Sequence, residues 1–168
     1  MSKVVALVTG ASGDVGATIA EEFAKSGVNV VLHYHHHGDR VDKLAEHLRE
    51  EYDVDVLCVQ ADISLEEDVE SMVDFIVDSF GRIDILVNHA SLCKDGDLLN
   101  KSASQFKRVL EINVLGTYLC SKYVGRVMLD RGSGKIINLA STNAIATYHP
   151  TAVDYDATQA SIISLTHN

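Results

Sequence analysis

The chain has 168 residues, of which 46% are hydrophobic and 23% are charged, and these values are ordinary for a single globular domain. Its 24 acidic and 14 basic residues give a net charge of −10, which argues against a nucleic-acid partner held by phosphate contacts. No apolar run approaches the roughly 20 residues of a membrane span, no signal peptide is evident, and three widely spaced cysteines predict reduced thiols, so we expect a cytoplasmic protein.

Strand-like and helical segments alternate along the chain. The first apolar run, residues 4–8, predicts a strand buried on both faces, because its hydrophobic side chains are continuous rather than alternating. Further strands are predicted over residues 29–34, 54–60, 83–88 and 135–139. Helices are predicted up to residue 26, then over residues 39–52, 65–80, 103–130 and 153–168. This alternation predicts an α/β fold, a doubly wound parallel sheet with helices on both faces.

A glycine-rich turn, TGASGDVG, lies between the first strand and the first helix at residues 9–16. Strand, glycine-rich turn and helix form the arrangement that binds a pyrophosphate, because glycine lets the backbone approach the phosphates and the helix start offers free N–H groups. The turn therefore predicts a dinucleotide site. The alternative interpretation is a tight turn without a ligand.

Ligands of such sheets bind beyond the carboxyl ends of the strands. The second predicted strand ends in HYHHH (residues 33–37), the third in Asp62, the fourth in Asn88 with Ala90, and the fifth in Ser141. We therefore expect these residues and the glycine turn to meet at one edge of the sheet.

Six motifs, taken in order, resemble those of the short-chain dehydrogenase/reductase family. They are TGASGDVG (9–16), ADI (61–63), GRIDILVNHA (81–90), EINVLGTY (111–118), KIINLAS (135–141) and YDATQAS (155–161). The resemblance covers the whole chain and implies an NAD(P)-binding Rossmann domain over residues 1–168. It also implies an oxidoreductase with a small carbonyl or alcohol substrate, and a homo-oligomer that needs neither a membrane nor a nucleic acid.

The resemblance implies roles for individual residues. Ser141 would hydrogen-bond the substrate oxygen, Tyr155 would exchange a proton with it, and Asn113 would hold a water or a helix kink in the proton relay. Carbonyl reduction develops negative charge on oxygen, which two hydroxyl donors stabilise. Within the cofactor site, Asp62 would bind adenine and Asn88 would support the sheet. The residues implied to bind the cofactor are Gly10, Ser12, Gly13, Val15, Gly16, Tyr34, Asp62, Ile63, Asn88, Ala90, Tyr155 and Gln159.

Gln159 departs from the family, which carries lysine four residues after the tyrosine. That lysine binds the nicotinamide ribose and lowers the tyrosine pKa, whereas Gln159 can hydrogen-bond a ribose but supplies no charge. A free tyrosine titrates near pH 10, so Tyr155 is expected to stay protonated at neutral pH. We therefore predict weak or absent dehydrogenase activity, with carbonyl reduction less impaired than alcohol oxidation. The alternative is a catalytically inactive nucleotide-binding or interaction protein.

Two further departures concern the cofactor side of the site. Asp14 stands where short family members have glycine, so its carboxylate either points away from a pyrophosphate or weakens binding. His89 replaces an asparagine, and we interpret it as a structural substitution rather than a proton-transfer group.

The chain ends at Asn168, inside the helix that carries Tyr155, and the predicted sheet lacks the last strands of the family. The strand at 135–139 would then be an edge with an exposed apolar face. A complete polypeptide of this kind would aggregate, oligomerise or pair with another chain. A fragment of a longer protein is an equally good explanation.

The end of the second strand bears on cofactor choice. NAD enzymes place an acidic residue there for the ribose 2′-hydroxyl, and here no acid precedes Asp39. The histidines and Arg40 suit a 2′-phosphate, so we predict NADP, with NAD as the alternative. The run LHYHHH also faintly resembles that of pteridine reductases. Adjacent histidines on one loop rarely converge on one ion, so we expect no metal site.

Overall fold

The computed structural model describes residues 3–146 and 152–168. Five strands form one parallel sheet in the order β3-β2-β1-β4-β5. The strands are β1 (Val5–Val8), β2 (Asn29–Tyr34), β3 (Val56–Gln60), β4 (Ile85–Asn88) and β5 (Lys135–Asn138). The helices are α1 (Asp14–Lys25), α2 (Gly38–Glu51), α3 (Glu66–Phe80), α4 (Ala103–Leu110), η1 (Glu111–Gly116), α5 (Thr117–Arg131), η2 (Thr142–Ala144) and α6 (Val153–Thr166). The predicted α/β doubly wound parallel sheet is confirmed.

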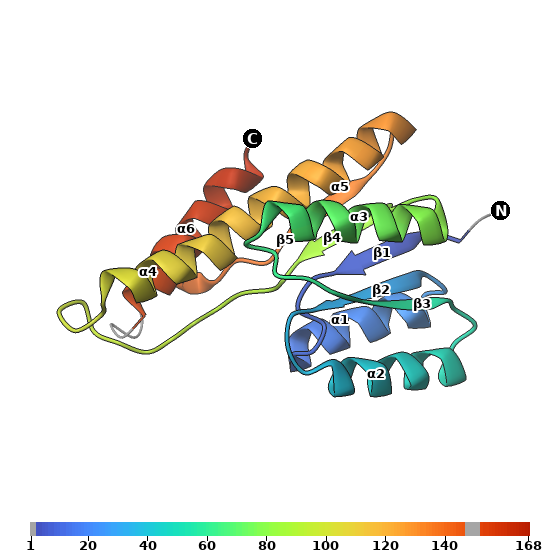
Figure 1. Cartoon of the computed structure of the whole chain (residues 1–168), viewed down its shortest axis with the longest axis horizontal. Coiled ribbons are helices and arrows are strands. Elements are labelled where there is room, and N and C mark those ends of the chain that lie inside the picture. The colour runs from blue at the N-terminus through green and yellow to red at the C-terminus, as the bar shows by residue number, and fades with distance from the viewer. Residues whose placement is uncertain (1–2, 147–151) are drawn as a thin grey trace.

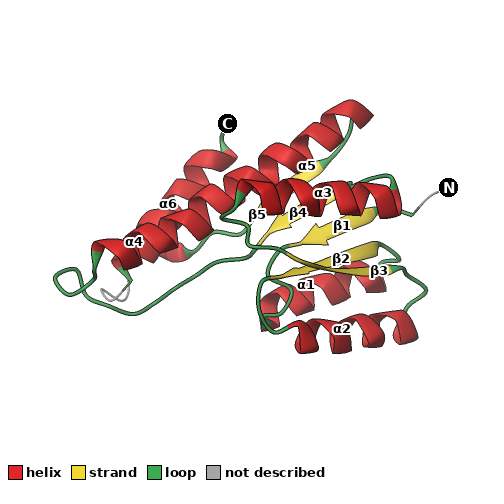
Figure 2. Cartoon of the chain, in the orientation of Figure 1, coloured by secondary structure: helices red, strands yellow, loops and turns green. Residues whose placement is uncertain are grey.

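Helices cover both faces of the sheet (Figures 1 and 2). On one face α1 and α2 pack against apolar side chains such as Val30 and Leu32, and on the other α3 and α5 pack against Leu7 and Val31. All four residues of β1 are buried, because this central strand is paired on both edges and covered on both faces.

The predicted strands at 54–60 and 83–88 begin two residues too early. Val54 and Ile83 are buried, but ladder pairing begins only at Val56 and Ile85. Hydrophobicity indicates burial rather than backbone pairing, so an apolar run makes the predicted strand begin before the residues that pair.

The predicted helix at 103–130 is wrong as one regular α-helix. It consists of α4, a π-helical segment η1 and α5, which follow one another without a break. Ser102 caps α4, since its hydroxyl accepts the Gln105 N–H while the Gln105 side chain accepts the Ser102 N–H. Widened turns of this kind occur often at functional sites, and η1 contains Asn113.

β5 lies at one edge of the sheet as predicted, and among the described residues it pairs only with β4. Its Ile136 and Ile137 are 39% and 45% exposed. Among the described residues, no helix is sufficiently long and apolar to cross a membrane.

Candidate active site

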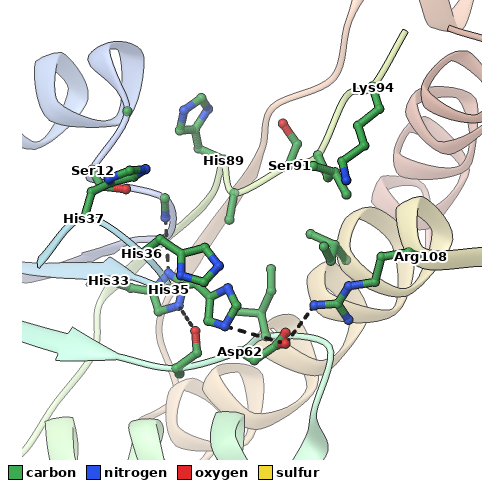
Figure 3. A pocket seen from close by; sticks show the side chains of 17 residues that line it. Ser12, His33, His35, His36, His37, Asp62, His89, Ser91, Lys94 and Arg108 are labelled. Carbon is green, nitrogen blue, oxygen red and sulfur yellow. Dashed lines mark hydrogen bonds and ion pairs between the residues drawn. The ribbon is translucent and has the colours of Figure 1, made fainter. Parts of the chain in front are cut away.

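A cavity of about 560 Å³ lies at the carboxyl ends of β1 to β4 (Figure 3). Seventeen residues line it, drawn from the ends of these strands, the loop after β4, and α4 with η1. Of the residues predicted to bind a cofactor, six line this cavity: Gly10, Ser12, Gly13, Asp62, Ile63 and Ala90. The structure thus gathers half of the predicted set around one hollow whose volume is typical of a ligand site.

The glycine turn packs too tightly for side chains at two positions. Gly10 has φ +74°, and a Cβ there would lie 2.9 Å from the Ala90 Cα. A Cβ on Gly16 would collide with the Gly10 carbonyl oxygen. A Cβ on Gly13, by contrast, would meet only that carbonyl oxygen, at 3.6 Å, and Gly13 lines the cavity. The turn is therefore closely packed at Gly10 and Gly16, whereas its other side, at Gly13, is open toward the cavity.

The open side coincides with the start of α1. No side chain among the described residues caps this terminus, whose N-cap is Gly13. The first N–H groups and the positive end of the helix dipole consequently remain available to an anion. Asp14 does not occupy this space, because its side chain is 93% exposed, lies outside the cavity and pairs with Arg40 at 3.4 Å. Of the two outcomes expected for Asp14, the structure has the carboxylate pointing away.

The buried ring of His33 holds the glycine turn through a hydrogen bond to Gly10. Its side chain is buried; Nδ1 accepts the Gly10 N–H at 3.2 Å, and Nε2 lies 3.1 Å from the Ala61 carbonyl oxygen. This geometry requires the neutral ring with the proton on Nε2, which donates to Ala61. Burial lowers the pKa of His33 to about 4, although the Ala61 bond opposes this shift. One neutral imidazole therefore joins β1, β2 and β3 beneath the cavity.

Asp62 is held ionised at the cavity wall. Burial raises its pKa, but hydrogen bonds from Ser64 and Arg108 outweigh burial and lower the pKa to about 2. Arg108 of α4 donates to Asp62 Oδ2 at 2.8 Å and to the Ser64 hydroxyl at 2.6 Å. His35 lies 3.8 Å from the same carboxylate (Figure 3). The sequence motifs indicate Asp62 but not Arg108, because a single arginine in an amphipathic helix gives no signal of its own.

Asn113 is almost fully buried, with all side-chain groups in use. Its Oδ1 accepts the Leu92 N–H at 2.7 Å, and its Nδ2 donates to the Leu92 carbonyl at 3.0 Å and to the Thr158 hydroxyl at 2.9 Å. The Thr158 hydroxyl in turn donates to the Tyr155 carbonyl at 2.7 Å. Asn113 therefore connects the cavity wall at Leu92 with the helix that carries Tyr155.

Ser141 and Tyr155 meet beyond the cavity. Ser141 lies at the end of β5, and its hydroxyl accepts the Asn143 N–H at 3.2 Å. Tyr155 lies in the first turn of α6, with its side chain close to that of Ser141. Burial raises the pKa of Tyr155 above its ordinary value, and the bond with Ser141 opposes that rise. Neither residue lines the cavity itself.

The remaining predicted residues lie around this constellation. Gln159 is 3% exposed, one turn after Tyr155, and outside the cavity. Asn88 is buried at the end of β4 and donates to Asn138 at 2.8 Å and Ser121 at 3.0 Å, so it ties β4 to β5 and α5. Val15 is 55% exposed, and Tyr34 packs against Gly38 at the start of α2.

The loop histidines contribute to the cavity together with His89. His35, His36 and His37 all line it, and His37 has φ 63°, a left-handed conformation at the start of α2. His89 also lines it, and burial lowers the pKa of His89 below its ordinary value. Among residues 3–146 and 152–168, no group of three metal-ligating side chains is arranged to hold an ion.

The chain is similar to known oxidoreductases over nearly its full length. The family model described as short chain dehydrogenase matches residues 4–168. An uncharacterized oxidoreductase of Thermotoga maritima is 35% identical over 164 residues, which cover 98% of this chain and 63% of that protein. The 3-oxoacyl-[acyl-carrier-protein] reductase FabG of Staphylococcus epidermidis is 35% identical over 161 residues, covering 96% of this chain and 65% of the reductase.

Solved structures agree with this similarity. The structure of NAD⁺-bound xylitol dehydrogenase superposes with a TM-score of 0.91 at 32% identity, covering 97% of this chain and 62% of that one. A short-chain dehydrogenase/reductase of Serratia marcescens gives a TM-score of 0.89 at 29% identity, with 96% and 65% covered. The chain thus spans slightly under two thirds of the length of these relatives.

Proposed function

The chain belongs to the short-chain dehydrogenase family, and on this premise we propose that it is an NAD(P)-dependent oxidoreductase. It transfers hydride between a nicotinamide dinucleotide and a small carbonyl or alcohol substrate. The observation that carries the proposal is the proximity of the Ser141 and Tyr155 side chains, beside a cavity that the glycine turn lines. Two hydroxyls of this kind serve a reaction in which an oxygen gains negative charge.

The cavity suits the cofactor. The open face of Gly13 and the uncapped start of α1 would receive the pyrophosphate, while Asp62 and Ile63 would contact the adenosine half. A bound nicotinamide dinucleotide supplies or accepts the hydride. Gly10, whose left-handed backbone keeps the turn against Ala90, shapes this floor without a side chain of its own.

The proton chemistry belongs to Tyr155. Its raised pKa keeps the hydroxyl protonated at neutral pH, so it can donate to the oxygen of a carbonyl that is being reduced. Ser141 provides the second hydrogen bond to that oxygen. Asn113 holds the backbone around Leu92 and Thr158, which fixes α6 relative to the cavity. Reduction is the favoured direction, because oxidation would require Tyr155 to accept a proton as a phenolate.

We propose NADP as the preferred cofactor. His35, His36 and His37 line the cavity at the end of β2, where an NAD enzyme carries an acid, and they can hydrogen-bond a 2′-phosphate. Arg40 follows this loop in the first turn of α2, where its backbone N–H donates to the His37 carbonyl at 3.1 Å, and its guanidinium donates to the Ser12 carbonyl of the glycine turn at 3.3 Å. The xylitol dehydrogenase neighbour binds NAD⁺, so direct comparison of the two cofactors is needed for this chain.

Calorimetric titration of the 168-residue chain with NADPH and then NADH tests the proposal. We expect micromolar binding, tighter for NADPH, followed by slow carbonyl reduction that Tyr155→Phe lowers at least about 100-fold. Tyr118→Phe is the matched control, because Tyr118 is exposed and distant from Ser141 in the chain. A folded chain that binds neither nucleotide would overturn the proposal.

A second function, nucleotide binding without turnover, is favoured by one observation. Gln159 replaces the charged residue that would lower the pKa of Tyr155. Under this alternative the chain binds NADPH, yet neither the wild type nor Gln159→Lys reduces any carbonyl. Turnover in Gln159→Lys that depends on Tyr155 would support the oxidoreductase instead.

We also propose that the chain forms a homo-oligomer. An apolar groove of about 390 Å³ lies between the helices α4–α5 and α6. Leu110, Val114, Leu115, Tyr118 and Leu165 line it, with Lys107 and Glu111 as its charged residues. Apolar surface rimmed by polar side chains suits a self-complementary contact across a two-fold axis.

A further inference from the structure

A buried ion pair, Lys101 with Asp154, lies outside both the cavity and the Ser141–Tyr155 contact. The side chains are 3% and 0% exposed, and Nζ lies 2.8 Å from each carboxylate oxygen. In the other ion pairs found among the described residues, each side chain keeps at least 14% exposure. Among these ion pairs, Lys101–Asp154 is therefore the one that is shielded from water on both sides.

Lys101 connects three segments at one point. It directly precedes Ser102, the N-cap of α4, and its ammonium also donates to the Lys94 carbonyl in the loop after β4. Asp154 lies in the first turn of α6. A parallel bridge between Gly96 and Ala152 lies beside the pair and joins the same loop to the start of α6.

Asp154 reaches Tyr155 directly. The Asp154 Oδ1 that accepts from Lys101 also accepts the backbone N–H of Tyr155 at 2.9 Å. This N–H is one of the first-turn donors that no helical carbonyl can satisfy. The carboxylate therefore fixes the backbone of Tyr155, and Lys101 fixes the carboxylate.

Stability alone does not account for such a pair. A buried ion pair can often be replaced by apolar residues without loss of stability, because desolvation of two charges cancels much of their attraction. Apolar side chains pack without a preferred orientation, whereas the bonds between the Lys101 ammonium and the two Asp154 oxygens are directional. These bonds therefore determine where the start of α6 lies relative to the loop after β4. Lys101 contacts the Asp154 carboxylate, and that carboxylate accepts the Tyr155 backbone N–H, so Lys101 acts on Tyr155 through backbone position.

We propose that Lys101 is a positioning residue which, through Asp154, holds the Tyr155 hydroxyl against Ser141. Its functional meaning rests on the proton-donor role proposed above for Tyr155. The geometry itself concerns only residues of this chain, so it can be measured without turnover.

Carbon-13 NMR of tyrosine labelled at Cζ tests the proposal, with Tyr155→Phe used to assign the resonance. In Lys101→Met we expect the Tyr155 resonance to move toward the position that tyrosine takes in the urea-unfolded chain, and the Tyr155 pKa to fall toward its ordinary value near 10, because the ring loses its fixed, half-buried position. Lys25→Met, which removes an exposed ion pair with Glu22, is the matched control and is expected to leave Tyr155 unchanged.

A second control separates positioning from stability. Leu48→Ala removes a fully buried side chain on the α2 side of the sheet and lowers the melting temperature without touching α6. If Lys101→Met and Leu48→Ala lower the melting temperature alike, and both leave the Tyr155 resonance and pKa as in the wild type, the pair is only structural and the proposal is overturned.

A further variant covers the case in which Lys101→Met does not fold. Lys101→Met with Asp154→Asn leaves no unpaired charge and keeps an oxygen that can accept the Tyr155 N–H. A displaced Tyr155 in this folded variant supports the proposal, and a wild-type resonance overturns it. Failure of the wild type to bind NADPH would remove the proposed function while leaving these NMR results intact.

Discussion

Tyr155 lacks a positive neighbour, and this determines what the residue can do. Among the described residues, no lysine or arginine acts on its hydroxyl; burial raises its pKa, and only the bond with Ser141 opposes the rise. The side chain that could change this is Gln159, one turn later on the same helix.

Gln159→Lys is expected to convert a weak catalyst into a better one. A cation within about 4–6 Å lowers the pKa of an acid by roughly 1–3 units, and each unit raises the phenolate fraction at neutral pH about tenfold. Alcohol oxidation should therefore gain about 10-fold or more, and reduction less. Steady-state rates in both directions between pH 6 and 10 measure this. An unchanged pH profile with bound NADPH would contradict the argument.

His33 predicts a specific loss of stability in acid. The folded state holds this ring neutral with a pKa of about 4, whereas an unfolded histidine titrates near 6.5, so the unfolded chain binds more protons between these values. The free energy of unfolding falls as the pH falls, by about 2 kcal/mol from this residue between pH 7 and pH 5.

Urea unfolding at pH 7, 6 and 5 measures this contribution. His33→Gln keeps a polar side chain at the position but has no titrating group, so its stability should change less over the interval. If the free energy of unfolding changes equally with pH in wild type and variant, the bonds to Gly10 and Ala61 do not depend on the neutral ring.

Some site residues were visible in the sequence and others were not. Asp62, Ser141 and Tyr155 stand at strand or helix ends within recognisable motifs; Asp62 lines the cavity, whereas Ser141 and Tyr155 lie outside it. Arg108 was not predicted, because its role depends on the distance between α4 and the end of β3. The hydrogen bonds of the His33 ring were equally invisible, since both of its partners are backbone groups.

At the level of elements, the first turn of α1 and the interior of α5 place opposite demands on glycine. A Cβ at Gly16 collides with the Gly10 carbonyl, whereas a Cβ at Gly125 meets nothing within 4 Å. Gly16→Ala should therefore displace the turn and abolish NADPH binding. Gly125→Ala should stabilise the chain by about 1 kcal/mol, the helix propensity difference, with binding unchanged.

Thermal unfolding and calorimetric titration of both variants check these outcomes. Tight NADPH binding by Gly16→Ala would show that the turn can yield without loss of the site. The comparison is matched, because both changes are glycine to alanine in a helix and differ only in what the new methyl group meets.

The helix predicted at 103–130 shows that hydrophobic periodicity predicts a helix but not an irregular turn within it. Its apolar pattern predicts one continuous helix, and the chain is indeed helical from Ala103 to Arg131. The widened turn η1 shifts the register by a single residue, too small a change for a hydrophobic pattern to reveal. At Gly116 the backbone of this turn packs closely against Ile63, because a Cβ on Gly116 would lie 2.7 Å from the Ile63 side chain. The irregular turn therefore coincides with a tertiary contact that the local sequence does not reveal.

For the whole molecule, the apolar groove between α4–α5 and α6 leads to a prediction about assembly. Leu115 and Tyr118 are 40% and 48% exposed there, and we expect a second copy to cover them. Leu115→Glu should convert the oligomer to a monomer, because a charge would be buried at the contact. Light scattering after size exclusion measures the mass, and Leu129→Glu, at an 80% exposed position outside the groove, is the control.

An unchanged mass in Leu115→Glu would exclude this groove as the interface. A wild type that is monomeric at micromolar concentration would contradict the assembly itself.

The strand order β3-β2-β1-β4-β5 also has a consequence for synthesis. β1 finds its first partner once residue 34 has been made, but its other edge waits for β4, which ends at Asn88. At about 5–20 residues per second, the ribosome needs roughly 3–10 s for the intervening segment. During that time the strand that is most enclosed in the finished protein has an open, apolar edge, which invites pairing with neighbouring nascent chains. Factors that slow elongation over residues 35–88 should therefore reduce the soluble yield more than slowing elsewhere.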